Sequence, residues 1–350
     1  MSTTCLCQPA PDVALGRYRW AMTSPFPNAP PAPYDGPSGR LRRARRPHVV
    51  VFGDLLLDVV VAPERAVARG TDVPGHVLFR QGGSAATTAR WVARLGGRVT
   101  LVCAVGRDAV GRALIEAIAA EGARVRAARV SGARTGRIGV VLAPDGERSF
   151  VADRGAADQL AADDLEPAWF SAVALLHLPA YSLLGQPLGA AGQRAIELAR
   201  SGGALVSLDL ASSRPLLAGG RRRAANVIRR IEADVLFASG QEADALLGGG
   251  RPEGLIELAP IVVVKRGAQG ASILAQDGSE TLRFEVATHA IQATDSTGAG
   301  DAFDAGFIVS WLDSLAAGRP AVSSLQRATL AGHRAAARHL AAPAAEIRFR

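Results

Sequence analysis

The sequence predicts an α/β fold in which a central, mostly parallel sheet lies between helices and carries a small β lid. Beyond Pro47, continuous apolar strands alternate with amphipathic helices, which is typical of a parallel sheet covered on both faces. Several short β segments in the first half do not fit this alternation, and they predict the lid. The chain has 350 residues, 48% of them hydrophobic, which is enough for a large buried core.

The first half of the folded region supplies strands of the main sheet, a helix and the lid. The β-branched run from Val49 to Phe52 predicts the first strand. A helix should open at Gly82-Gly83-Ser84, because small and apolar residues then recur at helical spacing. A main-sheet strand is expected over 99–105. The lid strands should come from about 58–80 and 134–153, the latter with a turn at Pro144-Asp145-Gly146.

The second half repeats the alternation. Short apolar runs bounded by turn residues predict strands, and the amphipathic segments between them predict helices. Strands are expected over 174–178, 205–210, 235–238 and 261–264, with helices over 190–200 and 221–231 and a buried helix from 298–300 onward. In such sheets, ligands bind at the carboxyl ends of the strands.

Residues 1–46 are expected to be a disordered extension, and residues 47–350 a single folded domain. The extension holds eight of the twenty prolines and has no apolar periodicity. Its seven arginines and two aspartates give +5, which leaves +3 of the total +8 for the other 304 residues. Nucleic acid is therefore not expected as a partner, except for weak binding by the extension. Deletion of residues 1–46 should abolish any salt-dependent DNA affinity.

Cysteine usage and hydropathy bear on the location of the protein. Three cysteines, at positions 5, 7 and 103, cannot form a disulfide framework, which favours a reducing, cytoplasmic location. No segment has the apolar run of a signal peptide or of a membrane span, so no membrane association is expected.

The segment from Asp295 to Phe307 carries the strongest indication of chemistry. A buried helix starts within Gly298-Ala299-Gly300, because apolar residues recur at helical spacing beyond it. The unpaired N–H groups at such a start, uncrowded at the two glycines, form an anion hole for a phosphoryl group. Asp301 enters the same turn.

A carboxylate beside a phosphate site requires an explanation, since the two repel each other. Phosphoryl transfer to an alcohol needs a group that takes the hydroxyl proton while donors and cations hold the phosphoryl charge. Asp301 fits the role of this general base. The alternative, an acid that only favours the positive end of the helix dipole, suits Asp304 better.

The sequence from Asp295 to Phe307 resembles the C-terminal signature of the ribokinase-like, or PfkB, family of carbohydrate kinases. Gly82-Gly83 with its following helix, then Gly106-Arg107-Asp108-Ala109-Val110-Gly111, is similar to the N-terminal signature. Both signatures stand in the family's order and spacing, and the resemblance runs from Val49 to the last helix. It implies a ribokinase-like fold and a kinase that uses ATP and Mg²⁺.

The resemblance implies four contacts to the sugar. Asp58 matches an aspartate that binds sugar hydroxyls, and Gly82 and Gly83 match a glycine pair that touches the sugar. Thr87 stands near the substrate, where relatives usually carry an asparagine. Ser84 replaces the lysine of true ribokinases, which disfavours ribokinase itself.

The resemblance also implies positions for the nucleotide and for metal ions. Lys265, Gly267 and Gly270 fall in the family's turn under the nucleotide, and His333 falls where relatives pack the adenine. A plain strand-end cation is the alternative for Lys265. Glu242 would support Mg²⁺ indirectly, with an ordinary surface glutamate as the alternative. Asp295 matches a position that helps many relatives to bind an activating K⁺.

The predicted function is an ATP-dependent kinase that phosphorylates a hydroxymethyl group of a small sugar. A nucleoside kinase of the same family is an alternative, because Thr87 and Ala157 depart from the family's asparagines. A non-catalytic sugar-binding protein on the same fold is another, motivated by Ser239 where the family has asparagine. The intact segment from Gly298 to Asp301 favours the enzyme. Since lid strands of relatives can form dimer contacts, a homodimer through the lid is also open.

Overall fold

The computed structural model describes residues 46–350 except 144–147, 212, 290–294, 342–345 and 348–350. The chain divides into two units, Met1–Arg42 and Arg43–Arg350, and the described residues belong to the second. The expected extension therefore lies, apart from Arg46, outside the described residues. The expected turn at Pro144-Asp145-Gly146 lies outside them as well.

The main sheet has nine strands in the order β13-β12-β11-β10-β9-β8-β1-β4-β5. Neighbours from β11 to β5 pair in parallel, and β12 is antiparallel to both β11 and β13. The strands are β1 His48–Phe52, β4 Arg98–Gly106, β5 Arg124–Val130, β8 Leu175–Pro179, β9 Leu205–Asp209, β10 Val235–Ser239, β11 Ile261–Lys265, β12 Ala271–Asp277 and β13 Glu280–Val286. The predicted α/β fold with a mostly parallel sheet is confirmed.

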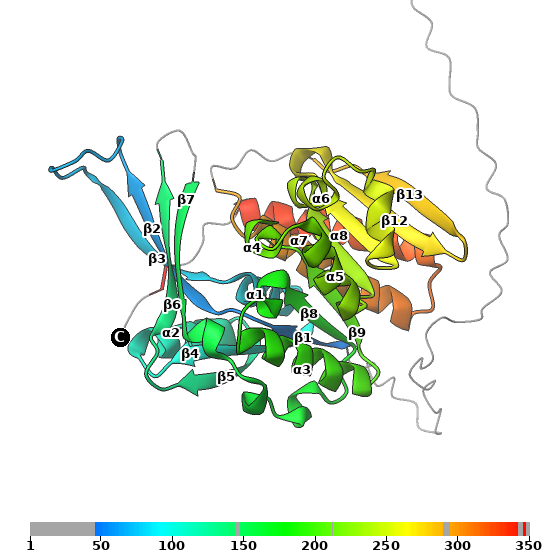
Figure 1. The fold of residues 1–350 in the computed structure, drawn as a ribbon, viewed down its shortest axis with the longest axis horizontal. Coiled ribbons are helices and arrows are strands. Elements are labelled where there is room, and N and C mark those ends of the chain that lie inside the picture. Colours follow the sequence, from blue (N-terminus) through cyan, green and yellow to red (C-terminus); the bar gives the residue numbers. More distant parts are fainter. Residues whose placement is uncertain (1–45, 144–147, 212, 290–294, 342–345, 348–350) are drawn as a thin grey trace, which may run out of the picture. The chain divides into compact units, whose positions relative to one another are not determined.

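Helices cover both faces of this sheet (Figure 1). Val49 and Val51 of β1 face a core shared with α1, α2, α7 and α8, while Val50 and Phe52 face a second core shared with α3, α5 and α6. This alternation follows from the two-residue period of a strand. The helices are α1 Ser84–Arg94, α2 Ala109–Ala120, α3 Leu188–Ser201, α4 Ser213–Leu217, α5 Arg221–Ile231, α6 Gly240–Leu247, α7 Ala299–Ala316 and α8 Ala321–Ala341.

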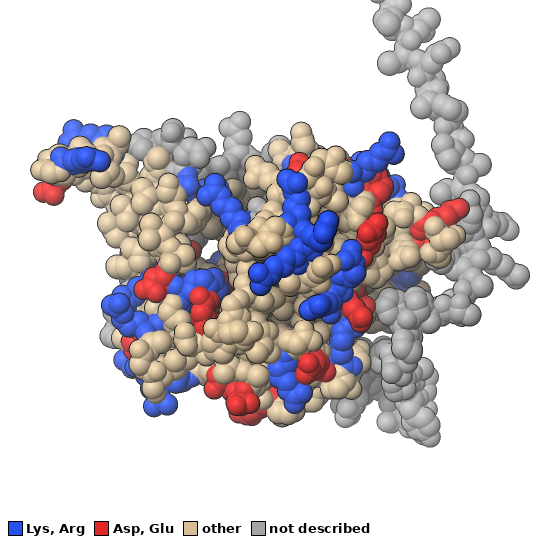
Figure 2. Space-filling view, in the orientation of Figure 1, with Lys and Arg blue, Asp and Glu red and all other residues tan. Residues whose placement is uncertain are grey.

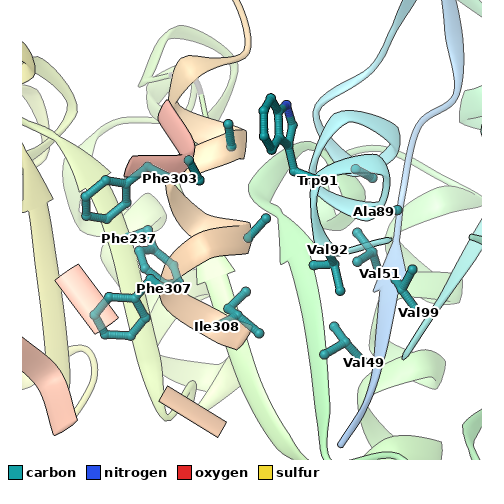
Figure 3. Packing of buried hydrophobic residues seen from close by; sticks show 14 of the residues in the cluster. Val49, Val51, Ala89, Trp91, Val92, Val99, Phe237, Phe303, Phe307 and Ile308 are labelled. Carbon is teal, nitrogen blue, oxygen red and sulfur yellow. The ribbon is translucent and has the colours of Figure 1, made fainter. Parts of the chain in front are cut away.

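Helix α7 is the central element of the first core. Phe303 and Phe307 point from α7 toward Phe237 of β10, while Val92 of α1 faces Val49 and Val51 of β1 (Figure 3). The rings of Phe237 and Phe307 lie edge to face with centroids 5.2 Å apart. Because α7 is buried on several sides, its first turn is fixed against the sheet.

The second, smaller sheet has the strand order β3-β2-β6-β7 and extends away from the main sheet at the left of Figure 1. Its strands are β2 Leu56–Pro63, β3 Gly75–Gly82, β6 Thr135–Leu142 and β7 Arg148–Gly155. A small sheet in addition to the main one was predicted and is present. Its movement as a lid stays a prediction.

The motif at Gly106 to Gly111 joins the two sheets. The side chain of Asp108 caps α2 by accepting from Gly111 N–H at 2.8 Å. It also accepts from the backbone N–H and the hydroxyl of Thr135, the first residue of β6. Thr135 in turn accepts from Gly106 N–H at the end of β4. The small sheet is therefore anchored to the main sheet at the root of β6.

The surface carries basic side chains over the region of α5 (Figure 2). This helix has the sequence RRRAANVIRRI, with five arginines and no acidic residue. Among the described residues, no helix combines the length and the apolar character that are needed to cross a membrane.

Candidate active site

The candidate site lies at the carboxyl edge of the main sheet, where parallel α/β sheets bind their ligands. The strand order reverses between β1 and β8, because the chain moves outward from β1 in one direction and later from β8 in the other. Asp209, Ser239 and Lys265 end the neighbouring strands β9, β10 and β11. The three side chains therefore share one edge.

The turn that starts α7 has the free donors that an anion hole requires. Gly298 caps the helix with φ of 83°, a left-handed conformation that glycine adopts without strain. Among the described residues, Ala299 N–H alone of the four N–H groups from Gly298 to Asp301 has an acceptor, Ser296 O at 3.2 Å. The N–H groups of Gly298, Gly300 and Asp301 remain available to an anion.

Asp301 stands in this turn and contacts α1. Its Oδ1 accepts a hydrogen bond from the Ser84 hydroxyl at 2.6 Å. Burial raises the pKa of Asp301 to about 7, against the Ser84 hydrogen bond and the Lys265 charge, which lower it. The negative charge of Asp209 adds to the increase. A carboxylate of this pKa is a stronger base than an exposed aspartate.

A buried cluster of Lys265, Asp209 and Asp304 lies beside the turn. Lys265 Nζ donates to Asp209 at 3.2 Å and to both oxygens of Asp304, at 3.0 and 3.1 Å. The interpretation of Asp304 as a first-turn acid that favours the helix dipole is therefore wrong. Its side chain is fully buried, because the second turn of α7 faces the sheet.

His339 of α8 closes the other side of the turn. Its Nε2 bonds to Thr297 O at 2.7 Å, and its Nδ1 accepts from Trp91 Nε1 at 3.0 Å. A Cβ placed on Gly298 would stand 3.1 Å from the His339 ring and 3.2 Å from Thr87 Cγ2. The structure thus brings Thr87 to the start of α7, where only a small residue fits.

Asp58 and the glycine pair lie together at the root of the small sheet. A Cβ on Gly82 would stand 2.0 Å from Asp58 Oδ1, and one on Gly83 would stand 2.6 Å from Asp54 O. No described residue donates a hydrogen bond to the Asp58 carboxylate. Burial raises the pKa of Asp58 to about 7, and the charges of Asp54 and Asp295 raise it further. This unpaired carboxyl suits a ligand hydroxyl.

Asp54 has a structural task. Its carboxylate accepts from Ala85 N–H at 3.1 Å at the start of α1 and pairs with Arg154 at 3.1 Å. Arg154 also pairs with Asp158 and lies over the Tyr181 ring. These contacts connect β1, α1 and β7.

Asp295 is bound by two arginines from the small sheet. Arg80 of β3 donates to its Oδ2 at 3.1 Å, and Arg148 of β7 donates to its Oδ1 at 3.0 Å. Burial opposes ionisation here, but hydrogen bonds from Thr297 and the two arginine charges lower the pKa of Asp295. Since two guanidinium groups already compensate this charge, the arrangement does not fit a monovalent cation.

The residues implied to bind the nucleotide fall into two groups. Gly270 has φ of 90°, and a Cβ on it would stand 2.3 Å from Val286 O. His333 Nε2 bonds to the same carbonyl at 3.1 Å, so Gly270 and His333 are neighbours. Gly267 lies at an open position of the same β11–β12 turn. The side chain of Lys265 instead lies beside Gly300.

Glu242 belongs to a capping box at the start of α6. Its carboxylate accepts from Ser239 N–H at 2.7 Å, and Ser239 Oγ accepts from Glu242 N–H. Burial and the charge of Asp209 raise the pKa of Glu242. The described residues contain no group of three or more His, Cys, Asp or Glu side chains that could hold a metal. The support of Mg²⁺ by Glu242 stays a prediction.

Several residues at the site escaped the sequence analysis. Ser84 was considered only as a replaced lysine, and its partner Asp301 lies 217 positions away. No local sequence pattern marks Arg80, Arg148 or His339, because their hydrogen-bond partners are also distant in the sequence. Asp209 could have been found, since it ends a strand that the sequence predicts.

Comparisons with known proteins identify the family of the chain. A family model described as "pfkB family carbohydrate kinase" matches residues 46–348. Fructokinase-1 of Zea mays is 34% identical over 271 residues, which cover 74% of this chain and 81% of that protein. Fructokinase-1 of Oryza sativa subsp. japonica is also 34% identical, with 73% and 80% covered.

Solved structures share the fold. A fructokinase with bound ATP from Xylella fastidiosa superposes with a TM-score of 0.68 at 27% identity, and the match covers 82% of this chain and 91% of that one. An adenosine kinase from Sinorhizobium meliloti superposes with a TM-score of 0.72 at 23% identity, with 87% and 98% covered. The second likeness bears on the fold alone.

The raised pKa of Asp301 predicts a pH-dependent stability. The folded protein holds this proton up to about pH 7, whereas an unfolded aspartate releases it near pH ~3.9. The stability that this group contributes is therefore present at low pH and is lost as the pH rises toward 7. We expect Asp301→Asn to raise the free energy of unfolding by ~1–3 kcal/mol at pH 8 and by little at pH 4.

Urea denaturation of both proteins from pH 4 to 8 measures this difference. Asp313→Asn, an exposed position on the same helix, is the matched control. A stability difference that stays constant over this range would contradict the raised pKa.

Proposed function

Because the chain belongs to the pfkB family of carbohydrate kinases, we propose that it transfers the γ-phosphoryl group of ATP to a hydroxymethyl group of a small sugar. The observation that carries this proposal is the first turn of α7. It offers three N–H groups without acceptors among the described residues and presents Asp301 beside them. Anion donors and a base in one turn are what phosphoryl transfer to an alcohol requires.

In the proposed reaction, the acceptor hydroxyl loses its proton to Asp301 as its oxygen forms a bond to the γ-phosphorus. The bond from that phosphorus to the bridging oxygen breaks, and ADP leaves with the electron pair. The N–H groups of Gly298, Gly300 and Asp301 hold the charge on the phosphoryl oxygens. Ser84 orients the Asp301 carboxylate through its 2.6 Å hydrogen bond.

Support for ATP and a divalent metal comes from relatives and from the edge of the sheet. The fructokinase from Xylella fastidiosa binds ATP, and a putative ribokinase II from E. coli was solved with ATP and Mg²⁺. Here, Gly267, Gly270 and His333 form the nucleotide end of the site, and Glu242 would support the metal through water. The metal neutralises phosphate charge.

Fructose is the first candidate for the acceptor, because the relatives at 34% identity are fructokinases. The unpaired Asp58 carboxyl, beside Gly82 and Gly83, supplies an acceptor for sugar hydroxyls. Thr87 fills the position where relatives usually have an asparagine, and it packs against Gly298.

Asp301→Asn tests the proposed base. We expect kcat to fall by ~10²–10⁴-fold, the range for a positioned general base. In the wild-type protein, kcat/KM should fall as the pH drops below about 7, because Asp301 then becomes protonated. Steady-state assays of ADP release measure both effects, with Asp313→Asn as the control. Near-wild-type turnover of Asp301→Asn would refute the assignment of the base.

An acceptor panel tests the substrate class. We expect ADP formation with fructose or another small sugar, and little with adenosine. Preferential turnover of adenosine would identify a nucleoside kinase instead. Sugar binding by calorimetry with no ADP formation from any acceptor would indicate a non-catalytic binder on the kinase fold.

A homodimer through the small sheet is a further part of the proposal. Val77 of β3 and Phe150 and Val151 of β7 are 57%, 55% and 71% exposed, so both edge strands of this sheet present large apolar side chains. Uncovered apolar side chains on edge strands favour association. We expect sedimentation velocity to show a dimer that Val151→Asp shifts to monomer, whereas Leu330→Asp on α8 does not. A monomeric wild-type protein at tens of micromolar would contradict this assembly.

A further inference from the structure

Lys265 lies directly against the turn that starts α7. Its Nζ atom is 3.3 Å from the point where a Cβ on Gly300 would stand, and apart from the adjacent backbone of α7 the described residues place only Lys265 Cε, at 3.9 Å, as a further atom within 4 Å of that point. The ammonium group is therefore next to the backbone of Gly300, whose N–H has no acceptor among the described residues. A residue with a side chain at position 300 would crowd the lysine.

Two carboxyl groups fix this ammonium, and their pKa values are shifted in opposite directions. Burial and the negative charge of Asp209 raise the pKa of Asp304 well above its usual value. Burial has the same tendency at Asp209, but the Lys265 charge and the hydrogen bond with Asp304 lower the pKa of Asp209. Of the three groups in the cluster, it is the Lys265 ammonium that lies at Gly300.

We propose that Lys265 is the buried cation of the phosphoryl site: held by Asp209 and Asp304 next to Gly300, it stabilises the negative charge that a phosphoryl group brings to the turn. This inference rests on the proposed function. It separates Lys265 from the nucleotide contacts at Gly267, Gly270 and His333. A fixed charge in a buried position acts strongly on a developing charge, because little solvent screens it.

The residue type supports this role. Lys265 is the single lysine among the 40 basic residues of the chain. An ammonium is a compact point charge on a narrow stem, whereas a guanidinium is a broad plane with five donors. Phe237 lies beneath, with its ring centroid 5.8 Å from Nζ, which adds a favourable contact to the cation.

The same cluster acts on Asp301. Lys265 lowers the pKa of Asp301, and Asp209 raises it. The other groups that face Asp301 or interact with its charge are Ser84 and Arg90 of α1, Asp54 after β1, and Tyr181 after β8. Because the Asp209 charge raises the pKa of Asp301, loss of that charge alone should lower this pKa. Loss of both charges should return it toward the wild-type value.

Two variants that differ only in the ammonium test the proposal. Asp209→Asn keeps Lys265, and the double variant D209N/K265M removes it together with the Asp209 charge, so that Asp304 is the one acid of the cluster that remains. We expect kcat of the double variant to be at least ~10-fold below that of D209N, somewhat less than the ~10²–10³-fold loss of a directly contacting donor. The acid limb of the kcat/KM profile should move to lower pH in D209N and return in the double variant. Arg283→Met, which removes an exposed charge on β13, is the control.

Equal kcat values for the two variants would overturn the proposal. A difference confined to KM for ATP would also overturn it, because that result identifies a nucleotide contact. Thermal denaturation establishes that both variants are folded. If the double variant does not fold, the D209N profile decides, since an acid limb that stays in place or moves to higher pH contradicts the effect of the cluster's charges on Asp301. If the wild-type protein is inactive toward every acceptor, the proposed function itself is wrong. That outcome is seen without any variant, so it is distinct from a failure of the Lys265 proposal.

Discussion

The burial of α7 is the constraint on which the rest of the site depends. Ten of its residues are buried between β10, α1 and α8, so the helix cannot turn or slide without opening the core. Because the helix is fixed, Asp301 and Asp304 are buried in surroundings that disfavour the ionised carboxylate. The neighbouring groups offset this cost. Lys265 compensates the deeper acid, and Ser84 donates to the one nearer the surface.

The small sheet contacts the rest of the domain near the candidate site at two places. At the root of β6, Thr135 bonds to Asp108 and to Gly106 of the main sheet. Farther out, Arg80 and Arg148 reach Asp295, three residues before the Gly298 turn. Hydrogen bonds buried at the root are harder to exchange for water than partly exposed ion pairs. The root is therefore the firmer attachment, and the contacts to Asp295 are the more labile one.

Periodicity and turn chemistry predicted the fold class and the elements that build the site. The helix over 221–231 is observed with those bounds, and the strands over 49–52 and 261–264 lie within one residue of the observed ones. Strands β12 and β13 were not predicted, and neither was α2. The C-terminal signature located the turn at Gly298, but the environment of Asp304 could not be predicted. Its partners, Asp209 and Lys265, are far apart in sequence and meet only because β9 and β11 end at the same edge.

The hydrogen bonds around this turn require one particular tautomer of the His339 imidazole. Since Trp91 donates to Nδ1, the single ring hydrogen must reside on Nε2, where it is given to the carbonyl of Thr297. A second hydrogen on the ring would face the indole N–H, and burial already lowers the pKa of His339. The first signature helix and the last helix of the chain thus meet at one neutral ring. Helix α8 thereby fixes the backbone just before the Gly298 turn through the contact of His339 with Thr297 O.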